Sequence, residues 1–191
     1  ENTGKDVLTF NRPISPDSYI KRWVPARIHA PGTTPPYSNW ATALAGYIVQ
    51  RVSGLPFADY AERRIFVPLG MDHSSFRQPL PKTLAPLLAR GYPRASAPPQ
   101  GFEAVGPAPA GALSTTGLDM ARFMIAHLDG GRGLLRPETA ATMHASPLDR
   151  VDAKSLIPPL DRAELGFLES DINGHEVIGH RGSTQNFQSL L

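Results

Sequence analysis

Apolar side chains recur every three or four positions in the first long patterned segment of the chain. Between residues 39 and 54 this spacing predicts an amphipathic helix. The apolar positions that share one side of it are Ala41, Leu44, Ala45, Ile48, Val49 and Val52. Ser38 or Asn39 can cap the start of this helix, and Gly54 stands where a glycine commonly ends one.

A second amphipathic helix is predicted to begin at Thr116. Thr116 and Asp119 form a capping-box pattern, so Asp119 is expected to be a capping carboxylate at the start of this helix. Its apolar positions are expected to be buried, and they are Leu118, Ala121, Met124, Ile125 and Leu128. Shorter helices are predicted at residues 15–24, from Pro56 to about Phe66, and from Pro137 to His144. Residues 79–109 are rich in proline and lack a period, so they predict a long surface segment.

The pattern changes from helical to alternating spacing after residue 160. Residues 165–169 and 175–179 flank an Asn173-Gly174 turn, which is a strong signal for a β-hairpin. Residues 187–191 predict the next antiparallel strand. We therefore expect a mainly helical region, residues 1–160, followed by the first antiparallel strands of an α/β region, residues 161–191. This order predicts an α+β fold.

Composition and charge exclude several kinds of partner. Of the 191 residues, 41% are hydrophobic and 19% are charged, which is ordinary for a globular protein. The net charge of +2 is small and no long run of like charges occurs, which argues against nucleic acid as a partner. The chain has no cysteine, so disulfides and thiolate metal sites are excluded. No apolar segment reaches the roughly 18 residues that span a bilayer, and no membrane segment is expected.

The histidines do not form a recognisable metal motif. His175, Glu176 and His180 resemble a zinc-protease motif, but the second histidine comes one residue too late. On a strand, a spacing of five places the two rings on opposite faces. We therefore expect no metal ion and no cofactor. The other histidines are expected to be isolated structural or surface groups, and they include His73, His127 and His144.

Several short motifs occur in a fixed order along the chain. They are Pro31-Gly32 with Tyr37-Ser38-Asn39, then Pro68-Leu69-Gly70-Met71, then residues 109–116, and finally Gly179-His180-Arg181-Gly182-Ser183. This ordered set resembles the penicillin-recognising serine hydrolases: class C β-lactamases, D-alanyl-D-alanine carboxypeptidases and related esterases. The resemblance implies a β-lactamase/transpeptidase-like fold, truncated here to the helical region plus part of an antiparallel sheet. It also favours a periplasmic or extracytoplasmic location.

The resemblance implies a role for each motif residue. Tyr37 matches the tyrosine of the Tyr-x-Asn motif, which completes the proton path to the leaving group. Asn39 would donate and accept hydrogen bonds at the amide of the substrate's acyl side chain. His180, on the strand that lines the cleft, would hydrogen-bond Tyr37 or a substrate carboxylate. Gly182 and Ser183 complete the third motif as substrate-binding residues, and the N–H of Ser183 would supply half of the oxyanion hole.

The nucleophile of this family opens a Ser-x-x-Lys turn well upstream of Tyr-x-Asn. One such pattern occurs here, at Ser18 and Lys21, but it stands too close to Tyr37 and is followed by Arg22. It indicates a solvated turn rather than a catalytic helix. The chain also begins at Glu1 and stops within an apolar run. We therefore expect a fragment that lacks the nucleophile and is inactive by itself.

The expected function of the parent protein is that of a serine hydrolase that forms an acyl-enzyme on amide or ester substrates. These include β-lactams, D-alanyl peptides and simple esters. Histidine at position 180 in place of lysine departs from class C β-lactamases and leans toward a peptidase or an esterase. The alternative is a non-catalytic ligand-binding or interaction module of the same fold. Truncation would leave apolar surface and an unpaired strand edge exposed, so self-association is also expected.

Overall fold

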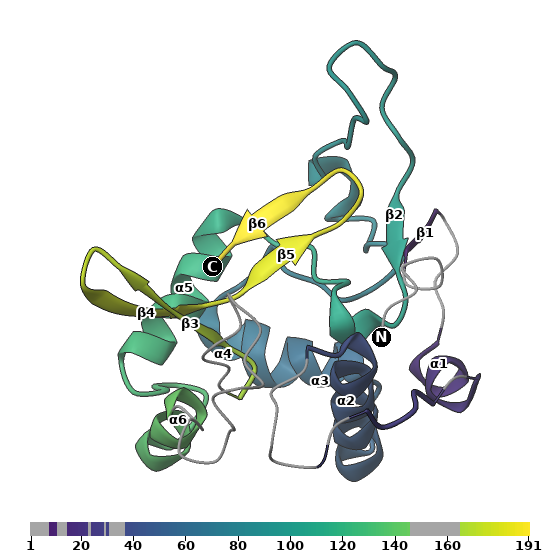
Figure 1. Cartoon of the computed structure of the whole chain (residues 1–191). Helices are drawn as coiled ribbons and strands as arrows, with labels where there is room; N and C mark the ends of the chain where they lie inside the picture. Colours follow the sequence, from purple (N-terminus) through teal and green to yellow (C-terminus); the bar gives the residue numbers. More distant parts are fainter. Residues whose placement is uncertain (1–7, 11–14, 23, 29, 31–36, 146–164) are drawn as a thin grey trace. The chain divides into compact units, whose positions relative to one another are not determined.

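A computed structural model of the chain, drawn in Figure 1, describes most of its residues. The described residues are 8–10, 15–22, 24–28, 30, 37–145 and 165–191. Contacts between residues divide the chain into two compact units. Unit 1 comprises Glu1–Pro25, Ser38–Phe123 and Ser183–Gln188, and unit 2 comprises Ala26–Tyr37, Met124–Gly182 and Ser189–Leu191.

Local capping signals set the bounds of the first helices. α1 spans Pro16–Arg22 and α2 spans Asn39–Ser53, in agreement with the sequence pattern. Ser38 is the N-cap of α2, because its hydroxyl accepts the N–H of Ala41 at 3.1 Å. Gly54 ends α2 with a φ of 71°, a left-handed conformation that glycine adopts without strain.

Three helical segments then follow one another without a break. They are α3 (Phe57–Ala61), the π-helical turn η1 (Glu62–Phe66) and α4 (Val67–Leu69). The helical path therefore runs from Phe57 to Leu69, close to the predicted end at about Phe66. Pro68, which has no N–H to donate, lies in α4 directly after the π-helical turn. Gly70 ends the segment in the left-handed conformation.

Aromatic rings make the centre of the core of unit 1. The ring of Phe76 lies 4.9 Å from that of Phe57 and 5.8 Å from that of Phe66, measured between centroids. Ala61, Phe66 and Met71 are buried beside it. The partly buried side chains that pack against this cluster include Ile65, Leu69, Leu113, Met120 and Phe123. The core thus joins the α3–α4 segment to the first part of α5 (Gly117–Leu128).

Small residues allow α2 to pack closely against η3 (Ala108–Ala110). Ala43 and Gly46 are the buried residues of α2. A Cβ atom on Gly46 would lie 2.5 Å from the Cβ of Pro109, well inside van der Waals contact. The apolar stripe that defines the helix in the sequence faces outward instead, and Val52 is 84% exposed. The side of α2 that is buried is therefore set by close backbone approach rather than by large apolar side chains.

The proline-rich segment lies only partly on the surface. It contains the turn η2 (Ala85–Leu87) and then β2 (Glu103–Val105), which pairs antiparallel with β1 (Leu8–Phe10). Ala104, Val105, Gly106 and Pro107 are all buried. The side-chain amide of Gln78 holds this strand, because it accepts the N–H of Val105 and donates to its carbonyl, each at 2.6 Å.

The buried face of α5 differs from the sequence-based prediction. The hydroxyl of Thr116 accepts the N–H of Asp119 at 3.2 Å, so the predicted cap of this helix is made by Thr116. The predicted buried stripe is wrong, because Ile125 is 62% exposed and Leu128 is 86% exposed. Asp119 and Ala126 are buried in their place. None of the described helices has both the length and the apolar character needed to cross a bilayer.

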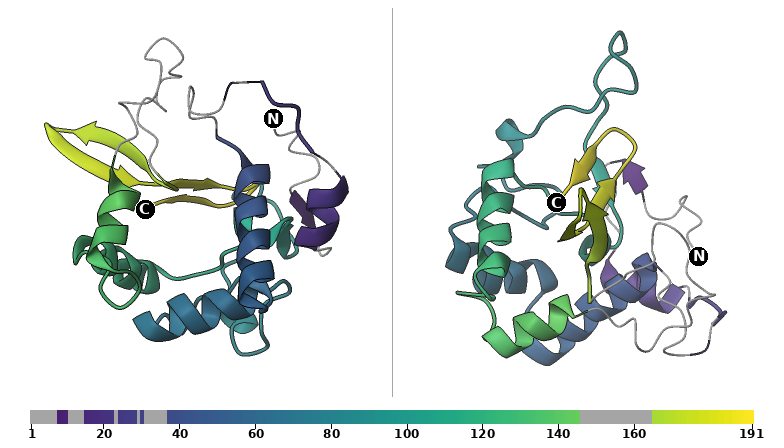
Figure 2. Two further views of the ribbon diagram at one scale, coloured as in Figure 1. Left: turned by 90° about the horizontal axis from the view of Figure 1, so that it is seen from below. Right: turned by 60° about the vertical axis from the view of Figure 1, so that its left-hand side comes forward.

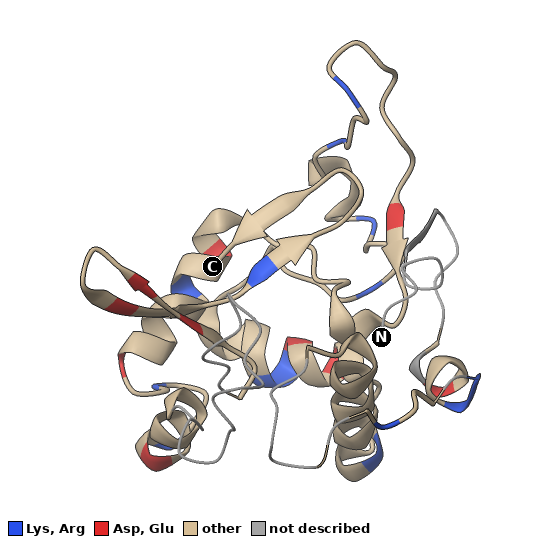
Figure 3. Ribbon diagram, in the orientation of Figure 1, with Lys and Arg blue, Asp and Glu red and all other residues tan. Residues whose placement is uncertain are grey.

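The last part of the chain forms two hairpins. β3 (Leu168–Ile172) and β4 (His175–Gly179) pair antiparallel in unit 2, with Glu and Asp side chains along them (Figure 3). The turn between them has positive φ at both Asn173 (55°) and Gly174 (78°), as the Asn-Gly sequence predicts. β5 (Arg181–Ser183) then pairs with β6 (Gln188–Leu190), as Figure 2 shows from two further directions.

Candidate active site

The rings of Tyr37 and His180 lie together in unit 2. Their centroids are 5.8 Å apart and their planes are inclined by 37°. Tyr37 is 48% exposed, and His180 is partly buried. The phenol and the imidazole can each donate and accept a hydrogen bond. Two side chains that can transfer protons therefore lie next to each other at a solvent-accessible position.

The backbone of His180 is held in a strand pair. His180 stands between β4 and β5, and its N–H donates to the carbonyl of Leu191 at 3.3 Å. The N–H of Leu191 donates back to the carbonyl of His180 at 3.0 Å. This reciprocal pair is the pattern of an antiparallel ladder, so the position of the imidazole is set by the sheet rather than by a loop.

Gly182 and Ser183 belong to β5, directly after His180 and Arg181. A Cβ atom on Gly182 would collide with the hydroxyl of Ser189 across the hairpin, so a larger residue here would require that side chain to turn away. The side chain of Ser183 is exposed, and its hydroxyl accepts the side-chain amide of Gln188 at 2.9 Å. The motif that the sequence singled out therefore lies on a paired strand.

Asn39 is the first residue of α2, in unit 1. The sequence left open whether Ser38 or Asn39 caps the helix, and the capping bond is made by Ser38. The amide of Asn39 is partly buried and is not the cap. Since Tyr37 belongs to unit 2, the two members of the Tyr-x-Asn motif stand on either side of a unit boundary.

The Ser-x-x-Lys pattern of α1 lies on a solvated turn, as predicted. The ammonium of Lys21 pairs with the carboxylate of Asp17 at 2.9 Å, and the two side chains are 72% and 47% exposed. The hydrogen bond that Lys21 donates to Asp17 raises the pKa of Lys21, which opposes the loss of a proton that a general base requires. The hydroxyl of Ser18 accepts a hydrogen bond from Ser15 at 2.8 Å.

Asp119 has a larger structural role than the sequence indicated. Its side chain is fully buried, and one carboxylate oxygen accepts the N–H of His73 at 2.8 Å and the hydroxyl of Ser74 at 2.9 Å. The other oxygen pairs with Arg122 at 2.9 Å, and the same guanidinium nitrogen donates to the carbonyl of Gly70 at 2.7 Å. These contacts join the turn after α4 to α5, and the capping pattern alone could not reveal them.

His127 and His144 are not isolated, in contrast to the sequence-based expectation. In unit 2, Nδ1 of His127 lies 3.0 Å from Nε2 of His144, and the ring of Phe167 packs at 5.2 Å and 5.5 Å from the two imidazoles. Burial lowers the pKa of His127, and the neighbouring His144 lowers it further. Within the described ranges, no three His, Asp or Glu side chains gather as metal ligands would.

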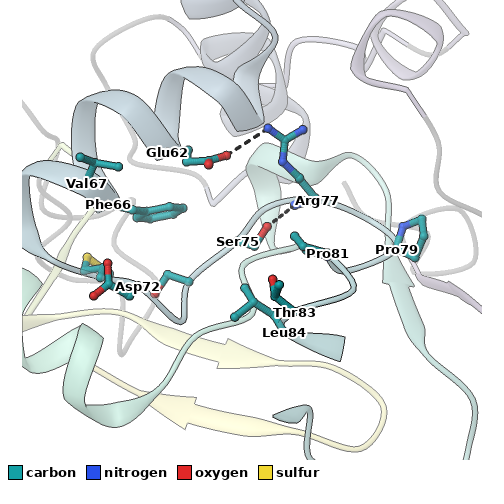
Figure 4. A pocket seen from close by; sticks show the side chains of 12 residues that line it. Glu62, Phe66, Val67, Asp72, Ser75, Arg77, Pro79, Pro81, Thr83 and Leu84 are labelled. Carbon is teal, nitrogen blue, oxygen red and sulfur yellow. Dashed lines mark hydrogen bonds and ion pairs between the residues drawn. The ribbon is translucent and has the colours of Figure 1, made fainter. Parts of the chain in front are cut away.

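A separate hollow of about 420 Å³ lies in unit 1 (Figure 4). Phe66 and Leu84 line it together with Arg77. The guanidinium of Arg77 is already bonded to Asp59 at 2.7 Å and to Glu62 at 3.0 Å, so its charge is compensated within the protein. The hollow holds none of the sequence-predicted site residues, and we do not assign it a catalytic role.

Comparison with known proteins indicates the same family as the sequence motifs. The sequence pattern of the Beta-lactamase family matches residues 9–191. A curated beta-lactamase of Pseudomonas fluorescens is 34% identical over 98 residues, which are 51% of this chain and 24% of that protein. The chain therefore spans about a quarter of the length of this relative.

Solved structures show the same fold. The octameric penicillin-binding protein homologue from Pyrococcus abyssi superposes with a TM-score of 0.69 at 24% identity, over 88% of this chain and 38% of that chain. The D-amino acid amidase from Ochrobactrum anthropi SV3 superposes with a TM-score of 0.59 at 27% identity, over 77% of this chain and 43% of that chain. The chain belongs to the Beta-lactamase family of penicillin-recognising serine hydrolases and has their α+β, β-lactamase/transpeptidase-like fold.

Proposed function

We propose that this chain supplies the proton-transfer and substrate-binding half of a serine hydrolase that forms an acyl-enzyme on amide or ester substrates. The observation that carries the proposal is the contact between the rings of Tyr37 and His180 at 5.8 Å. These two residues come from motifs that lie far apart in the sequence. A phenol beside an imidazole is suited to pass a proton between a nucleophile and a leaving group.

In the proposed reaction, a serine hydroxyl attacks the substrate carbonyl and gives its proton to the lysine of the family's Ser-x-x-Lys motif, from which the proton passes to Tyr37. The tetrahedral oxyanion is stabilised by backbone N–H groups, one of them that of Ser183. When the bond to the leaving amine or alkoxide breaks, Tyr37 returns the proton to that group. Water then adds to the acyl-serine by the reverse sequence and releases the acid. Asn39 holds the acyl amide, and Gly182 belongs to the strand β5 that binds the substrate.

The nucleophile in this proposal does not come from α1. Lys21 is paired with Asp17 and solvent-exposed, so it is not a suitable base for Ser18. Because the chain spans 43% of the amidase chain, we place the nucleophile in the part of the fold that these residues do not span. Residues 1–160 and 161–191 would then be the helical region and the first strands of one incomplete catalytic domain, inactive by itself.

The substrate class is inferred from position 180. Imidazole in place of an ammonium provides a group that can both donate and accept a hydrogen bond. A fixed cation for a β-lactam carboxylate is thus missing from this position. Together with the likeness to a D-amino acid amidase, this favours amides, peptides or simple esters over β-lactams as natural substrates.

Covalent labelling tests the proposed function directly. A fluorescent fluorophosphonate should label the full-length protein on one serine outside residues 1–191 and should leave the 191-residue chain unlabelled. A fluorescent penicillin should label more slowly. Labelling of Ser18 in the 191-residue chain would overturn the assignment of the nucleophile. A full-length protein that neither probe labels, and that lacks esterase and amidase activity, would favour a non-catalytic binding module instead.

A further inference from the structure

A carboxylate outside the family's motifs holds the turn that follows the His-x-Gly strand. One oxygen of Glu103 accepts the N–H of Gln185 at 2.6 Å, and the other accepts the hydroxyl of Thr184 at 3.0 Å. Glu103 and these two residues all belong to unit 1, although more than 80 positions of sequence separate them. Hydrogen bonds that reach an ionised carboxylate are roughly twice as strong as those between neutral groups.

The turn itself is closed by bonds through Thr184. The N–H of Thr184 donates to the carbonyl of Phe187 at 2.9 Å, and its hydroxyl accepts the N–H of Phe187 at 3.3 Å. The Thr184 hydroxyl thus accepts a hydrogen bond from the turn while it donates its own proton to Glu103. The conformation of the turn and the position of the carboxylate are therefore coupled.

The strand that carries Glu103 is itself firmly placed. Glu103 is paired with Phe10 in the β1–β2 ladder, and Ala104 and Val105 after it are 0% and 6% exposed. The amide of Gln78 clamps Val105 through two hydrogen bonds. Because this strand is buried and held by two hydrogen bonds, it supports the carboxylate rigidly. Figure 1 shows β2 beside the turn of the β5–β6 hairpin.

A second contact holds the same turn from another side. Gly91 is buried, and a Cβ atom there would lie 2.6 Å from the Cβ of Asn186 and 3.2 Å from the ring of Phe187. The turn thus packs against the backbone of Gly91 and is hydrogen-bonded to Glu103. Among the described residues, no ion pair joins Glu103 to a Lys or Arg side chain, so the turn provides the bonds that this carboxylate accepts.

We propose, on the basis of the function proposed above, that Glu103 is a positioning residue for the reaction. Thr184 directly follows Ser183, whose N–H is the proposed oxyanion donor. Oxyanion donors must be held within a fraction of an ångström of the position where charge develops, because their benefit comes from preorganisation. By holding the Thr184 hydroxyl and the Gln185 N–H, the carboxylate of Glu103 fixes the chain directly after the Gly182–Ser183 peptide that presents this N–H.

The test compares Glu103→Gln and Glu103→Ala with the unchanged full-length protein on a simple p-nitrophenyl ester. Glu103→Ala should lower kcat by roughly 10- to 100-fold with KM within about twofold, since displacement of a catalytic group by about 1 Å costs on the order of 100-fold. Glu103→Gln keeps one acceptor and should retain most of the activity. Reversible inhibition by a phosphonate that mimics the tetrahedral oxyanion should weaken in parallel with kcat. Glu138→Ala, an exposed carboxylate of α6 (Pro137–His144), is the matched control and should change neither value.

The outcomes separate this inference from the proposed function. If the unchanged protein hydrolyses esters and Glu103→Ala keeps its kcat within twofold, the positioning role is wrong and the proposed function stands. If the unchanged protein is inactive and unlabelled, the proposed function is wrong, and the positioning role that rests on it is wrong as well. Should Glu103→Ala fail to fold, Thr184→Val decides: it removes the hydroxyl that donates to Glu103 and should lower kcat and weaken phosphonate binding in parallel, and a kcat within twofold of that of the unchanged protein would overturn the coupling.

Discussion

The carboxylate of Asp119 accepts a hydrogen bond from the hydroxyl of Ser74 at 2.9 Å, with both side chains buried and 45 positions of sequence between them. With the bonds to His73 and Arg122, this contact fastens the turn after α4 to α5. Three groups would lose their acceptor together if the carboxylate were removed. That network is therefore the place where a single change should cost the most stability.

Asp119→Ala should lower the free energy of unfolding by about 3 kcal/mol, because the His73 N–H, the buried Ser74 hydroxyl and the Arg122 guanidinium all lose the carboxylate as an acceptor. Asp119→Asn keeps one acceptor oxygen and should cost about half as much. Urea denaturation followed by circular dichroism measures both. Asp129→Ala is the control, because the Asp129–Arg132 pair is exposed and should contribute less than about 1 kcal/mol. Equal losses for Asp119→Ala and Asp129→Ala would contradict the network.

Tyr37→Phe in the full-length protein should lower kcat by about 100-fold or more, because the phenyl ring keeps its contact with His180 but can no longer carry a proton. Its melting temperature should stay unchanged, since Tyr37 is 48% exposed. Tyr92→Phe is the matched control, because Tyr92 is 47% exposed and lies in the proline-rich segment. Steady-state ester hydrolysis checks this, and a Tyr37→Phe enzyme with full kcat would end the proton-transfer role.

The stability of unit 2 should fall as the pH drops below about 6.5, the usual pKa of histidine. Burial and the proximity of His144 lower the pKa of His127 in the folded state, so the unfolded chain binds more protons in this range. The stabilisation from the neutral His127 ring is complete above the pKa of His127 in the unfolded state. It is lost as the pH falls through the pKa of His127 in the folded state. Hydrogen exchange of α6 between pH 7.5 and 5 reports the loss.

His127→Gln should flatten that pH dependence, since glutamine cannot be protonated in this range. His175→Gln is the control, because His175 is exposed on β4 and should leave the dependence as it was. If α6 exchanges at the same opening free energy at both pH values in the unchanged protein, the His127–His144 pair does not weaken on acidification.

The 191-residue chain should self-associate at micromolar concentration. Large apolar side chains are exposed on two helices, with Val52 on α2 at 84% and Leu128 on α5 at 86%. Exposed apolar surface of this kind is usually covered in a stable protein. Multi-angle light scattering should give a mass above that of the monomer, and Val52→Glu with Leu128→Glu should restore the monomer. A strictly monomeric unchanged chain would refute the expectation.

Elements specified by neighbouring residues were predictable from the sequence. Ser38 and Gly54 bracket α2, and the Asn173-Gly174 turn joins β3 and β4 as expected. Each of these signals acts through hydrogen bonds or backbone conformation within a few residues, so no knowledge of distant contacts is needed. The family was predictable for a different reason, because its motifs keep their order along the chain.

Features that depend on distant partners were not predictable. The pattern of α5 gives an apolar stripe but does not say which element packs against it, and the stripe with Ile125 and Leu128 is exposed in the structure. The same limit hid the contact between His127 and His144, and the three partners of Asp119. Polar side chains of this kind acquire a role only when tertiary structure brings a second group to them.

The close approach of α2 to η3 has a consequence for how this protein can change over evolutionary time. Because a Cβ at position 46 would overlap Pro109, any replacement of Gly46 forces α2 and the 108–110 turn apart. Alanine alone should already cost about 1–3 kcal/mol. Asn39 is the first residue of α2, so a shift of this helix should also move the side chain that we propose to hold the substrate amide. Natural homologues that replace Gly46 should therefore carry a compensating, smaller residue at Pro109.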